Sequence, residues 1–303
     1  MTFNVTVLGT GSALPTVNRY PTAHLLNANE RFFLIDCGEG TQLQLRRNRI
    51  KLQRIDHIFI SHLHGDHYFG LIGLLTSMSL LGREKQINIY SDKQLAPLIN
   101  YQLNISYSKL NFEILFHTVD ESGQLLFSNN DLTVNAVKLN HKIPCFGFLF
   151  KEKQDQFKIR PEKIKAYNIS LEWIRRIKEG ENFKKDDNTI ISNEELTFPK
   201  EKNRSYAFCS DTKYDEKIVE QIENVDLLYH EATFMENHSE RAKKTYHSTA
   251  RQAALIAKQA NAKKLLIGHF SARYKDVTPL LEEARMVFEN TFCAKENECY
   301  EIT

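Results

Sequence analysis

Four residues that can bind metal ions occur within six positions of this chain. They are His62, His64, Asp66 and His67, in the stretch SHLHGDHYFG that follows the apolar residues HIFI. Imidazole nitrogens and carboxylate oxygens are ligands that suit zinc. His62 and His64 are two positions apart, so in an extended chain they point the same way, and Gly65 permits a turn that brings Asp66 and His67 to the same cavity. The spacing predicts a metal site just beyond a strand.

Further candidate ligands follow other strand-like runs. The runs LTVNAVKLN, YAFCS, VDLLYH and KLLIG lead, in turn, to His141, Asp211, Glu231 and His269. A single residue such as His141 is more often a polar turn residue, but sites tend to form just beyond strand ends, and the whole set favours a site. Together with the cluster at 62–67, these residues are more ligands than one metal ion can use, but they are enough for two ions. Two zinc ions would contribute a charge of +4, and Asp66, Asp211 and a bridging hydroxide a charge of −3. The site would stay net positive, which suits an anionic substrate such as a phosphodiester.

The elements that hold these residues predict an α/β (α+β) protein. Strands dominate the first half, and strands alternate with helices in the last third. Two sheets with helices on the outside fit this order. Residues 151–204 differ, because they carry 14 Lys and Arg against 11 Asp and Glu with few apolar residues, although Trp173, Ile174 and Ile177 could pack a short helix. We interpret 1–303 as one domain and 151–204 as an inserted arm without a core of its own; a disordered loop is the alternative.

Composition excludes several classes of protein. The net charge of +2 does not by itself indicate a nucleic-acid binder, and the five cysteines form no CxxC pair, which favours free thiols over disulfides or a thiolate zinc site. The N-terminus lacks a basic stretch followed by a continuous apolar one, so we expect no signal peptide. The longest apolar run, 69–82, has 14 residues, fewer than the roughly 20 that cross a membrane. We therefore expect a cytoplasmic protein with no membrane contact.

Seven motifs together resemble a known family. The pattern HxHxDH after a strand, with a later His, Asp and His, resembles the metallo-β-lactamase superfamily. More narrowly, the chain resembles ribonuclease Z, the tRNA 3′-processing endonucleases, over nearly its whole length. The motifs are VLGTGSALPT, IDCGEGTQLQLRR, SHLHGDHYFGL, FCSDT, HEATF, HSTARQAA and LIGHFSARY. HxHxDH alone is shared by hydrolases of thioesters, lactams, sulfates and nucleic acids, whereas HEATF followed by HSTA is more specific.

The resemblance implies a fold and a role for each site residue. The fold would be an αββα sandwich of two facing mixed sheets flanked by helices. Two Zn2+ per chain would be bound, with Mn2+ as a substitute. The ligands of the first ion would be His62, His64 and His141, those of the second Asp66, His67 and His269, and Asp211 would bridge both. Asp66 would also help to deprotonate the attacking water, and His247, oriented by Glu231, would protonate or stabilise the leaving 3′ oxygen. Asp36 would hydrogen-bond the ligand loop without binding metal.

The remaining candidates concern RNA. The stretch RRNRIKLQR contains Arg46, Arg47, Arg49, Lys51 and Arg54 on what reads as one helical stretch, whose basic face could follow phosphates or could simply be solvated. In the family a protruding arm grips tRNA, so Arg175 and Arg176 of the segment 151–204 are also candidates. Two departures weaken the likeness: NISLEWIRRIKEG has no Gly/Pro-rich stretch, and PTVNRY stands where the family loop reads PxKxRN.

The first hypothesis is a zinc-dependent endoribonuclease that removes 3′ trailers from tRNA precursors by metal-activated hydroxide attack and leaves a 3′ hydroxyl. Its partners would be precursor tRNA and a second copy of the chain, since the family is usually dimeric, and not DNA. The second hypothesis is a binuclear-zinc hydrolase of a small phosphodiester, sulfate ester or thioester. The third is a non-catalytic RNA-binding or scaffold subunit with a degenerate site, against which the complete ligand set argues. The other histidines (His24, His57, His117, His230 and His238) are interpreted as structural.

Overall fold

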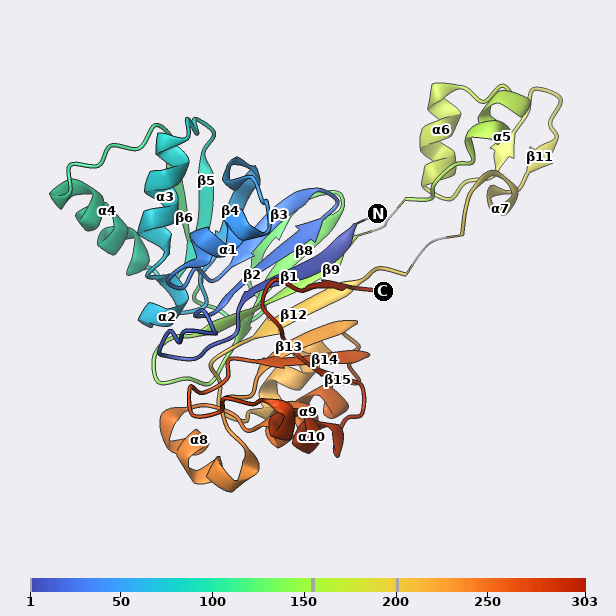
Figure 1. The fold of residues 1–303 in the computed structure, drawn as a ribbon. Helices are drawn as coiled ribbons and strands as arrows, with labels where there is room; N and C mark the ends of the chain where they lie inside the picture. Colours follow the sequence, from blue (N-terminus) through green and yellow to red (C-terminus); the bar gives the residue numbers. More distant parts are fainter. Residues whose placement is uncertain (1, 154–155, 200–201) are drawn as a thin grey trace. The chain divides into compact units, whose positions relative to one another are not determined.

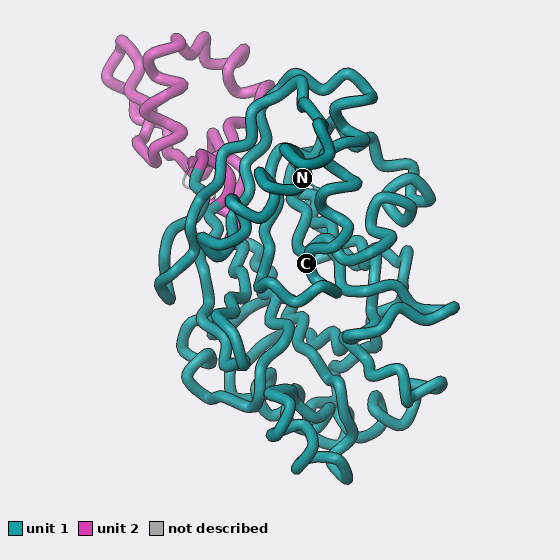
Figure 2. Tube along the Cα trace, turned by 90° about the vertical axis from the view of Figure 1, so that its left-hand side faces the viewer, with its two compact units in different colours: residues 1–128, 133–150, 204–303 teal, residues 129–132, 151–203 magenta. Residues whose placement is uncertain are grey.

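A computed structural model describes residues 2–153, 156–199 and 202–303. The chain divides into two compact units, coloured separately in Figure 2. Unit 1 comprises residues 1–128, 133–150 and 204–303, and unit 2 comprises residues 129–132 and 151–203. Each unit is described by itself.

The first sheet of unit 1 has seven strands in the order β16-β1-β2-β3-β4-β5-β6. The strands are β1 (Phe3–Gly9), β2 (Ala23–Ala28), β3 (Arg31–Ile35), β4 (Ile55–Phe59), β5 (Ile87–Ser91), β6 (Ile114–Thr118) and β16 (Cys299–Glu301). β2 and β3 form an antiparallel hairpin, and β3 to β6 run parallel. β16 pairs with β1, so the two chain ends lie in neighbouring strands.

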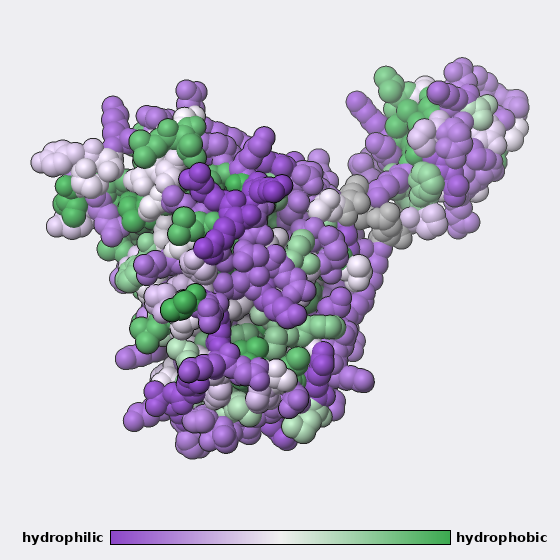
Figure 3. All heavy atoms as spheres, in the orientation of Figure 1, coloured by the Kyte–Doolittle hydropathy of each residue, from purple (hydrophilic) through white to green (hydrophobic). Residues whose placement is uncertain are grey.

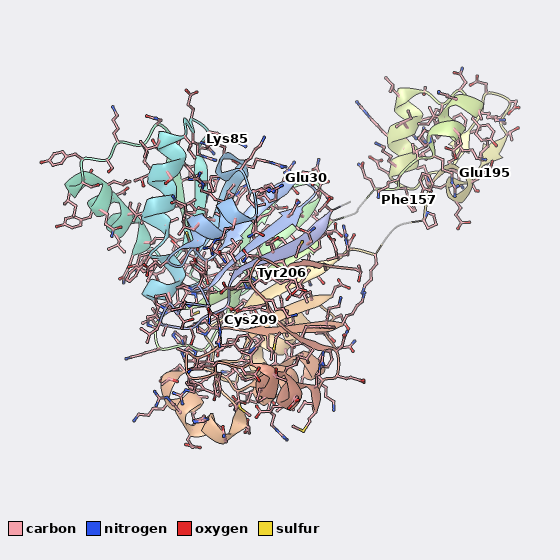
Figure 4. The ribbon with its side chains drawn as sticks, in the orientation of Figure 1. Glu30, Lys85, Phe157, Glu195, Tyr206 and Cys209 are labelled. Atoms are coloured by element: carbon pink, nitrogen blue, oxygen red, sulfur yellow. The ribbon has the colours of Figure 1, made fainter. Side chains whose placement is uncertain are left out.

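The second sheet has the order β15-β14-β13-β12-β9-β8-β7. Its strands are β7 (Leu125–Ser128), β8 (Leu132–Lys138), β9 (Phe146–Glu152), β12 (Ser205–Cys209), β13 (Leu227–Glu231), β14 (Lys264–Gly268) and β15 (Thr291–Cys293). β12 to β15 run parallel, while β7 and β8 are antiparallel. Because β12, β13 and β14 are parallel, their carboxyl ends meet at one edge of the sheet. Figure 4 labels Tyr206 and Cys209 on β12.

Aromatic side chains fill the space between the two sheets. Phe33 of β3 contacts Phe150 of β9 with ring centroids 5.9 Å apart, and Phe59 of β4 contacts Phe148 of β9 at 5.2 Å. All four side chains are 0% exposed, and large edge-to-face pairs of this kind bury much apolar area. The inner faces of the two sheets therefore form one shared core.

Helices cover the outer faces of both sheets (Figure 1). The first sheet packs against α1 (Thr41–Arg47), α3 (Leu71–Leu80) and α4 (Leu95–Ile105). The second packs against the 3-10 helix η2 (Glu216–Ile222), α9 (Ala250–Gln259) and α10 (Thr278–Arg285). The remaining short helices of unit 1 are η1 (Leu52–Arg54), α2 (Gly65–Tyr68), η3 (Glu236–His238) and α8 (Ser239–Thr245). The predicted αββα sandwich is confirmed.

Unit 2 contains a small apolar core. Its elements are α5 (Pro161–Ala166), α6 (Leu171–Lys178), α7 (Asn193–Leu196) and the hairpin of β10 (Phe183–Lys184) with β11 (Ile190–Ile191). The core residues are Ile159, Ile169, Ile177, Phe183, Ile191 and Leu196, against which Trp173 and Ile174 pack. The expected short helix is confirmed, but the expectation that 151–204 lacks a core of its own is wrong. Residues 154–155 and 200–201 of that segment lie outside the described residues.

The surface of the described chain fits the composition. Figure 3 shows hydrophilic side chains over most of the visible surface, with separate apolar patches between them. No helix among the described residues is both long enough and apolar enough to cross a bilayer. All five cysteines are free thiols, as predicted.

Candidate metal centre

The predicted ligands lie at the ends of strands from both sheets of unit 1. The segment 61–67 follows β4, and His141, Asp211 and His269 follow β8, β12 and β14. Asp211 and His269 have left-handed backbones, with φ of 52° and 57°. Residues other than glycine seldom adopt this conformation, which tends to occur at functional sites. The left-handed conformation turns the chain sharply at Asp211 after β12 and at His269 after β14.

Three histidines and one carboxylate form a first donor group. His64 Nδ1 lies 3.0 Å from His62 Nε2 and 3.2 Å from His141 Nε2. Asp211 Oδ2 lies 3.7 Å from His62 Nε2 and 3.8 Å from His141 Nε2. The four donor atoms all lie within 4.8 Å of one another. Nitrogen and oxygen donors at these separations can surround a single ion.

A second donor group lies on the other side of Asp211. Asp66 Oδ2 is 3.4 Å from His67 Nε2 and 3.5 Å from His269 Nε2. Asp211 Oδ1 is 3.1 Å from both of these nitrogens. The two carboxylate oxygens of Asp211 therefore face different groups, which is the arrangement of a bridging ligand.

Two buried nitrogens indicate that the second group fits a cation. His67 Nε2 and His269 Nε2 are buried, and within the described part of the chain neither makes a hydrogen bond of normal geometry, although each lies 3.1 Å from Asp211 Oδ1. An unpaired buried polar atom is costly, and a metal ion would satisfy both nitrogens. Burial lowers the pKa of His67, but the carboxylates of Asp211, Asp66 and Asp36 outweigh it and raise that pKa well above its ordinary value. The surroundings therefore stabilise positive charge at this point.

Asp36 orients two of the histidines, as expected. It is fully buried after β3, where Oδ2 accepts a hydrogen bond from His67 Nδ1 at 2.7 Å. The Ser61 hydroxyl donates to the same oxygen at 2.9 Å and lies 3.0 Å from His62 Nδ1, from which it can accept. Both histidines are thereby held with Nε2 directed at the donor groups, the usual effect of such outer partners.

Glu231 is the corresponding carboxylate at the end of β13. Its Oε1 accepts from His247 Nδ1 at 2.8 Å and from Thr212 N at 2.9 Å. Burial lowers the pKa of His247, but the charge and hydrogen bond of Glu231 outweigh it and raise the pKa to about 9. On distance alone, His247 forms a third donor group with Asp211 and His269. Its Nδ1 donates to Glu231, so only Nε2 is left to bind an ion or to act on a substrate.

Thr233 extends this network to the second group. Its hydroxyl donates to Glu231 Oε2 at 2.5 Å and lies 3.0 Å from His269 Nδ1, from which it can accept. On the other side of the site, His141 Nδ1 donates to the Tyr246 carbonyl at 3.0 Å. Sequence reasoning missed Ser61, Thr233 and Tyr246; each is next to or two residues from a predicted site residue, which was the only available signal.

The centre opens into a cavity of about 480 Å3. Its walls include His64, Asp66, Asp211, His247 and His269, together with Ala13 and Pro15 of the loop after β1. Ala13 N donates to Asp66 Oδ2 at 2.7 Å, so this loop contacts the centre directly.

The predicted basic residues are arranged differently from expectation. α1 ends at Arg47 and Arg49 has a left-handed φ of 57°, so the expectation of one helical stretch through Lys51 is wrong. Arg46, Arg49 and Lys51 are exposed, and so is Arg47, whose guanidinium lies 5.3 Å from the centre of the Tyr20 ring. In unit 2, Arg176 is paired with Glu181 at 2.6 Å, whereas Arg175 is exposed.

The histidines interpreted as structural belong to none of the donor groups formed by the described residues. His24 is buried between the sheets, with Nδ1 2.8 Å from the Tyr206 hydroxyl. His57 lies 3.3 Å from the Tyr90 hydroxyl, His117 2.9 Å from Asn88 and His238 2.6 Å from Asn237. His230 donates to the carbonyl of Glu231.

Comparison with curated proteins finds relatives over the whole chain. Ribonuclease Z of Bacteroides fragilis strain YCH46 is 46% identical over 301 residues, which is 99% of each chain. Ribonuclease Z of Phocaeicola vulgatus is 46% identical over 97% of this chain and 96% of its own. The family model described as Anti-Pycsar protein Apyc1 matches residues 3–159. That match includes the donors up to His141 but stops before Asp211, whereas the full-length relatives span every donor.

Solved structures agree with the fold. The short form of human tRNase Z has a TM-score of 0.72 and 29% identity, with 99% of each chain covered. YhfI of Bacillus subtilis, described as a metallo-beta-lactamase fold protein, has a TM-score of 0.70 and 20% identity over 99% of this chain and 100% of its own. The second match shows the fold alone.

Proposed function

The chain belongs to the ribonuclease Z family, and we propose that it cuts tRNA precursors directly after the discriminator nucleotide, leaving a 3′ hydroxyl on the tRNA. The observation that carries this proposal is the complete set of donors in two groups, with the His247–Glu231 pair beside them and Nδ1 of His247 already bonded. The relatives named ribonuclease Z cover 97–99% of the chain at 46% identity.

Two divalent ions fit the two donor groups. His62, His64 and His141 would hold one ion, and Asp66, His67 and His269 the other, with one oxygen of Asp211 toward each. Zinc suits this mixture of imidazole and carboxylate donors, and Mn2+ is the substitute to test. Bound there, such ions act as Lewis acids and make water a better nucleophile at neutral pH.

The chain's own residues would handle the protons. Asp66 faces the cavity and would take a proton from the attacking water. His247 also lines the cavity, and its Nδ1 donates to Glu231 Oε1, which leaves Nε2 to protonate or stabilise the leaving 3′ oxygen. A hydrogen-bonded carboxylate favours the protonated ring, as a general acid requires.

Residues 151–204 are the candidate tRNA-binding arm. Unit 2 is a compact body with its own core, and the segment has three more basic than acidic residues (14 − 11). Arg175 is exposed on α6 and is the better candidate contact, because Arg176 is already paired with Glu181. Figure 4 labels Glu195 and Phe157 in this unit. We also propose that the protein forms a homodimer in which the arm of one copy reaches RNA bound to the other. Its proposed location is the cytoplasm.

The test is cleavage of an end-labelled tRNA precursor, mapped to the nucleotide, with and without a chelator. Cutting after the discriminator nucleotide that stops with the chelator and returns with zinc is the expected result. Brisk hydrolysis of a small phosphodiester, sulfate ester or thioester without cutting of the precursor would favour the alternative hydrolase. Deleting the tip of the arm should abolish precursor cleavage while a small phosphodiester is still cut.

A further inference from the structure

Tyr229 is a buried side chain that the proposed chemistry does not use. It lies on β13, two residues before Glu231, and is 0% exposed. Its ring stacks on Phe208 of β12, with centroids 5.0 Å apart and an angle of 5° between the planes. It also makes an edge-to-face contact with His24 of the first sheet, at 4.2 Å between centroids. Neighbours from both sheets therefore fix the position of this ring in the shared core.

The hydroxyl of Tyr229 lies against the turn that carries His269. Gly268 is the last residue of β14, and His269 follows it with the left-handed φ of 57°. A β-carbon on Gly268 would lie 2.5 Å from Tyr229 Oη and 2.6 Å from its Cε2, closer than nonbonded atoms approach. The tyrosine thus occupies the space that a side chain at position 268 would need, a common reason for glycine near a strand end.

This hydroxyl has no hydrogen bond of normal geometry with the described residues. Burial raises the pKa of Tyr229 well above its ordinary value, and so do the charges of three nearby carboxylates, Asp211, Glu231 and Asp36. The backbone amide of His269 acts on this pKa in the opposite direction. The hydroxyl is therefore uncharged and close to the His269 amide. An unsatisfied buried hydroxyl lowers stability, and a group kept at such a cost tends to serve a site.

Other contacts hold the far side of His269. The Thr233 hydroxyl lies 3.0 Å from both Nδ1 and the carbonyl oxygen of His269. Phe270 N donates to the Thr10 carbonyl at 2.8 Å, which fixes the chain directly after the turn. A left-handed residue other than glycine persists only where its surroundings hold it. Tyr229 lies on the amide side of His269, before the turn.

We propose that Tyr229 is a positioning residue of the metal centre, whose hydroxyl holds the backbone of Gly268 and His269 in the turn that directs His269 Nε2 at the second donor group. The inference rests on the proposed function for one point only, that His269 binds the second ion. His269 Nε2 lies 3.1 Å from Asp211 Oδ1 and 3.5 Å from Asp66 Oδ2. Distances between a metal ion and its ligands vary by only about 0.2 Å, so a small relaxation of the turn weakens binding of that ion while the fold persists.

The test compares the wild type with Tyr229→Phe and Tyr206→Phe. The second variant is the matched control, because it also removes a buried phenol oxygen between the sheets, but one that lies 2.8 Å from His24 Nδ1. Urea unfolding of the chelator-treated full chain measures the stability without metal. Competition with a chromophoric chelator measures the affinities for two Zn2+ ions. Visible absorption of the Co2+-loaded protein reports the ligand geometry.

The expected result separates metal affinity from stability. Tyr229→Phe should bind one ion as the wild type does and the other about 10-fold more weakly, with altered Co2+ absorption. Its unfolding midpoint without metal should equal or exceed that of the wild type, because the unsatisfied hydroxyl is gone. Tyr206→Phe should show the reverse, with a lower unfolding midpoint, unchanged affinity for both ions and unchanged Co2+ absorption.

Unchanged metal affinity in Tyr229→Phe would overturn the proposal. An affinity and an unfolding midpoint that fall together would also overturn it, because the hydroxyl would then be merely structural. If one ion is weakened as expected but the wild type does not cut a tRNA precursor in parallel, the proposed function fails and the positioning role stands. A wild type that binds no ion would overturn both.

Discussion

Asp36 and Glu231 perform the same task on the two sheets. Each is a fully buried carboxylate at or just beyond the end of a strand. Asp36 accepts from His67 directly and contacts His62 through the hydroxyl of Ser61. Glu231 accepts from His247 directly and contacts His269 through the hydroxyl of Thr233. Two carboxylates thereby set the orientation of four histidines, so the donor groups are supported from both sheets.

Asp36→Asn should weaken metal binding without unfolding the protein. The amide would present either an oxygen that accepts less strongly or an NH2 group that cannot accept from His67 Nδ1. Loss of such an outer partner typically costs about 10- to 100-fold in metal affinity. Competition with a chromophoric chelator measures this affinity. Asp56→Asn, which removes an acceptor of Arg83 and Lys85 outside the centre, is the control and should leave the metal affinity unchanged.

His247→Ala should retain both metal ions and lose most turnover. General acid catalysis contributes about 10²- to 10⁴-fold, so single-turnover cleavage should fall within that range. Elemental analysis of the same preparation gives the metal content. His238→Ala, a histidine outside the donor groups, should cut normally. Loss of an ion together with the activity would instead make His247 a metal ligand, and unchanged cleavage would remove it from the reaction.

Thr233→Val should disturb His269 and Glu231 together. Valine has nearly the same shape but leaves Glu231 Oε2 and His269 Nδ1 without the hydroxyl that joins them. An unsatisfied buried group costs about 1–3 kcal/mol, so the free energy of unfolding should fall by that amount and metal affinity should fall with it. Chemical denaturation and chelator competition measure the two effects. Thr233→Ser keeps the hydroxyl and should recover most of the metal affinity; equal losses for both variants would show that the methyl group, not the hydroxyl, matters.

Acid should destabilise the protein partly through His24. Burial lowers the pKa of His24 to about 3. Between its ordinary pKa of roughly 6.5 and that value, the unfolded chain binds a proton that the folded chain does not, so stability falls as the pH falls, by roughly 1.4 kcal/mol per pH unit within the window. His24→Gln should flatten this part of the stability–pH curve relative to wild type, measured by urea unfolding from pH 7 to pH 4.

The control for this change is Tyr206→Phe, which removes the hydroxyl 2.8 Å from His24 Nδ1 but keeps the buried ring. It should lower stability while retaining the acid dependence. Because the other ionisable groups of the chain are the same in wild type and His24→Gln, the difference between their curves reports on His24. Parallel curves for wild type and His24→Gln would contradict the assignment.

The sequence by itself determined the strands, the donors and the sandwich. The donors are chemically distinct and each follows an apolar run, so His62, His141, Asp211 and His269 could be predicted from local pattern alone. The prediction of a helix through Lys51 was wrong because Arg49 adopts a left-handed backbone conformation. Arg seldom adopts this conformation, and no local sequence pattern predicts it here. The core of unit 2 was missed because its apolar residues are spread thinly from Ile159 to Leu196, and only folding brings them together.

Only the tertiary structure decided how the site is held. Asp36 and Ser61 are 25 positions apart, and Glu231 and His247 are 16 apart, so their hydrogen bonds depend on where the strands end in space. Tyr20 and Glu296, which are 276 positions apart, meet because β16 returns to pair with β1. Sequence spacing fixes which side chains share a short segment, whereas contacts across strands and sheets are set by the packing of the whole domain.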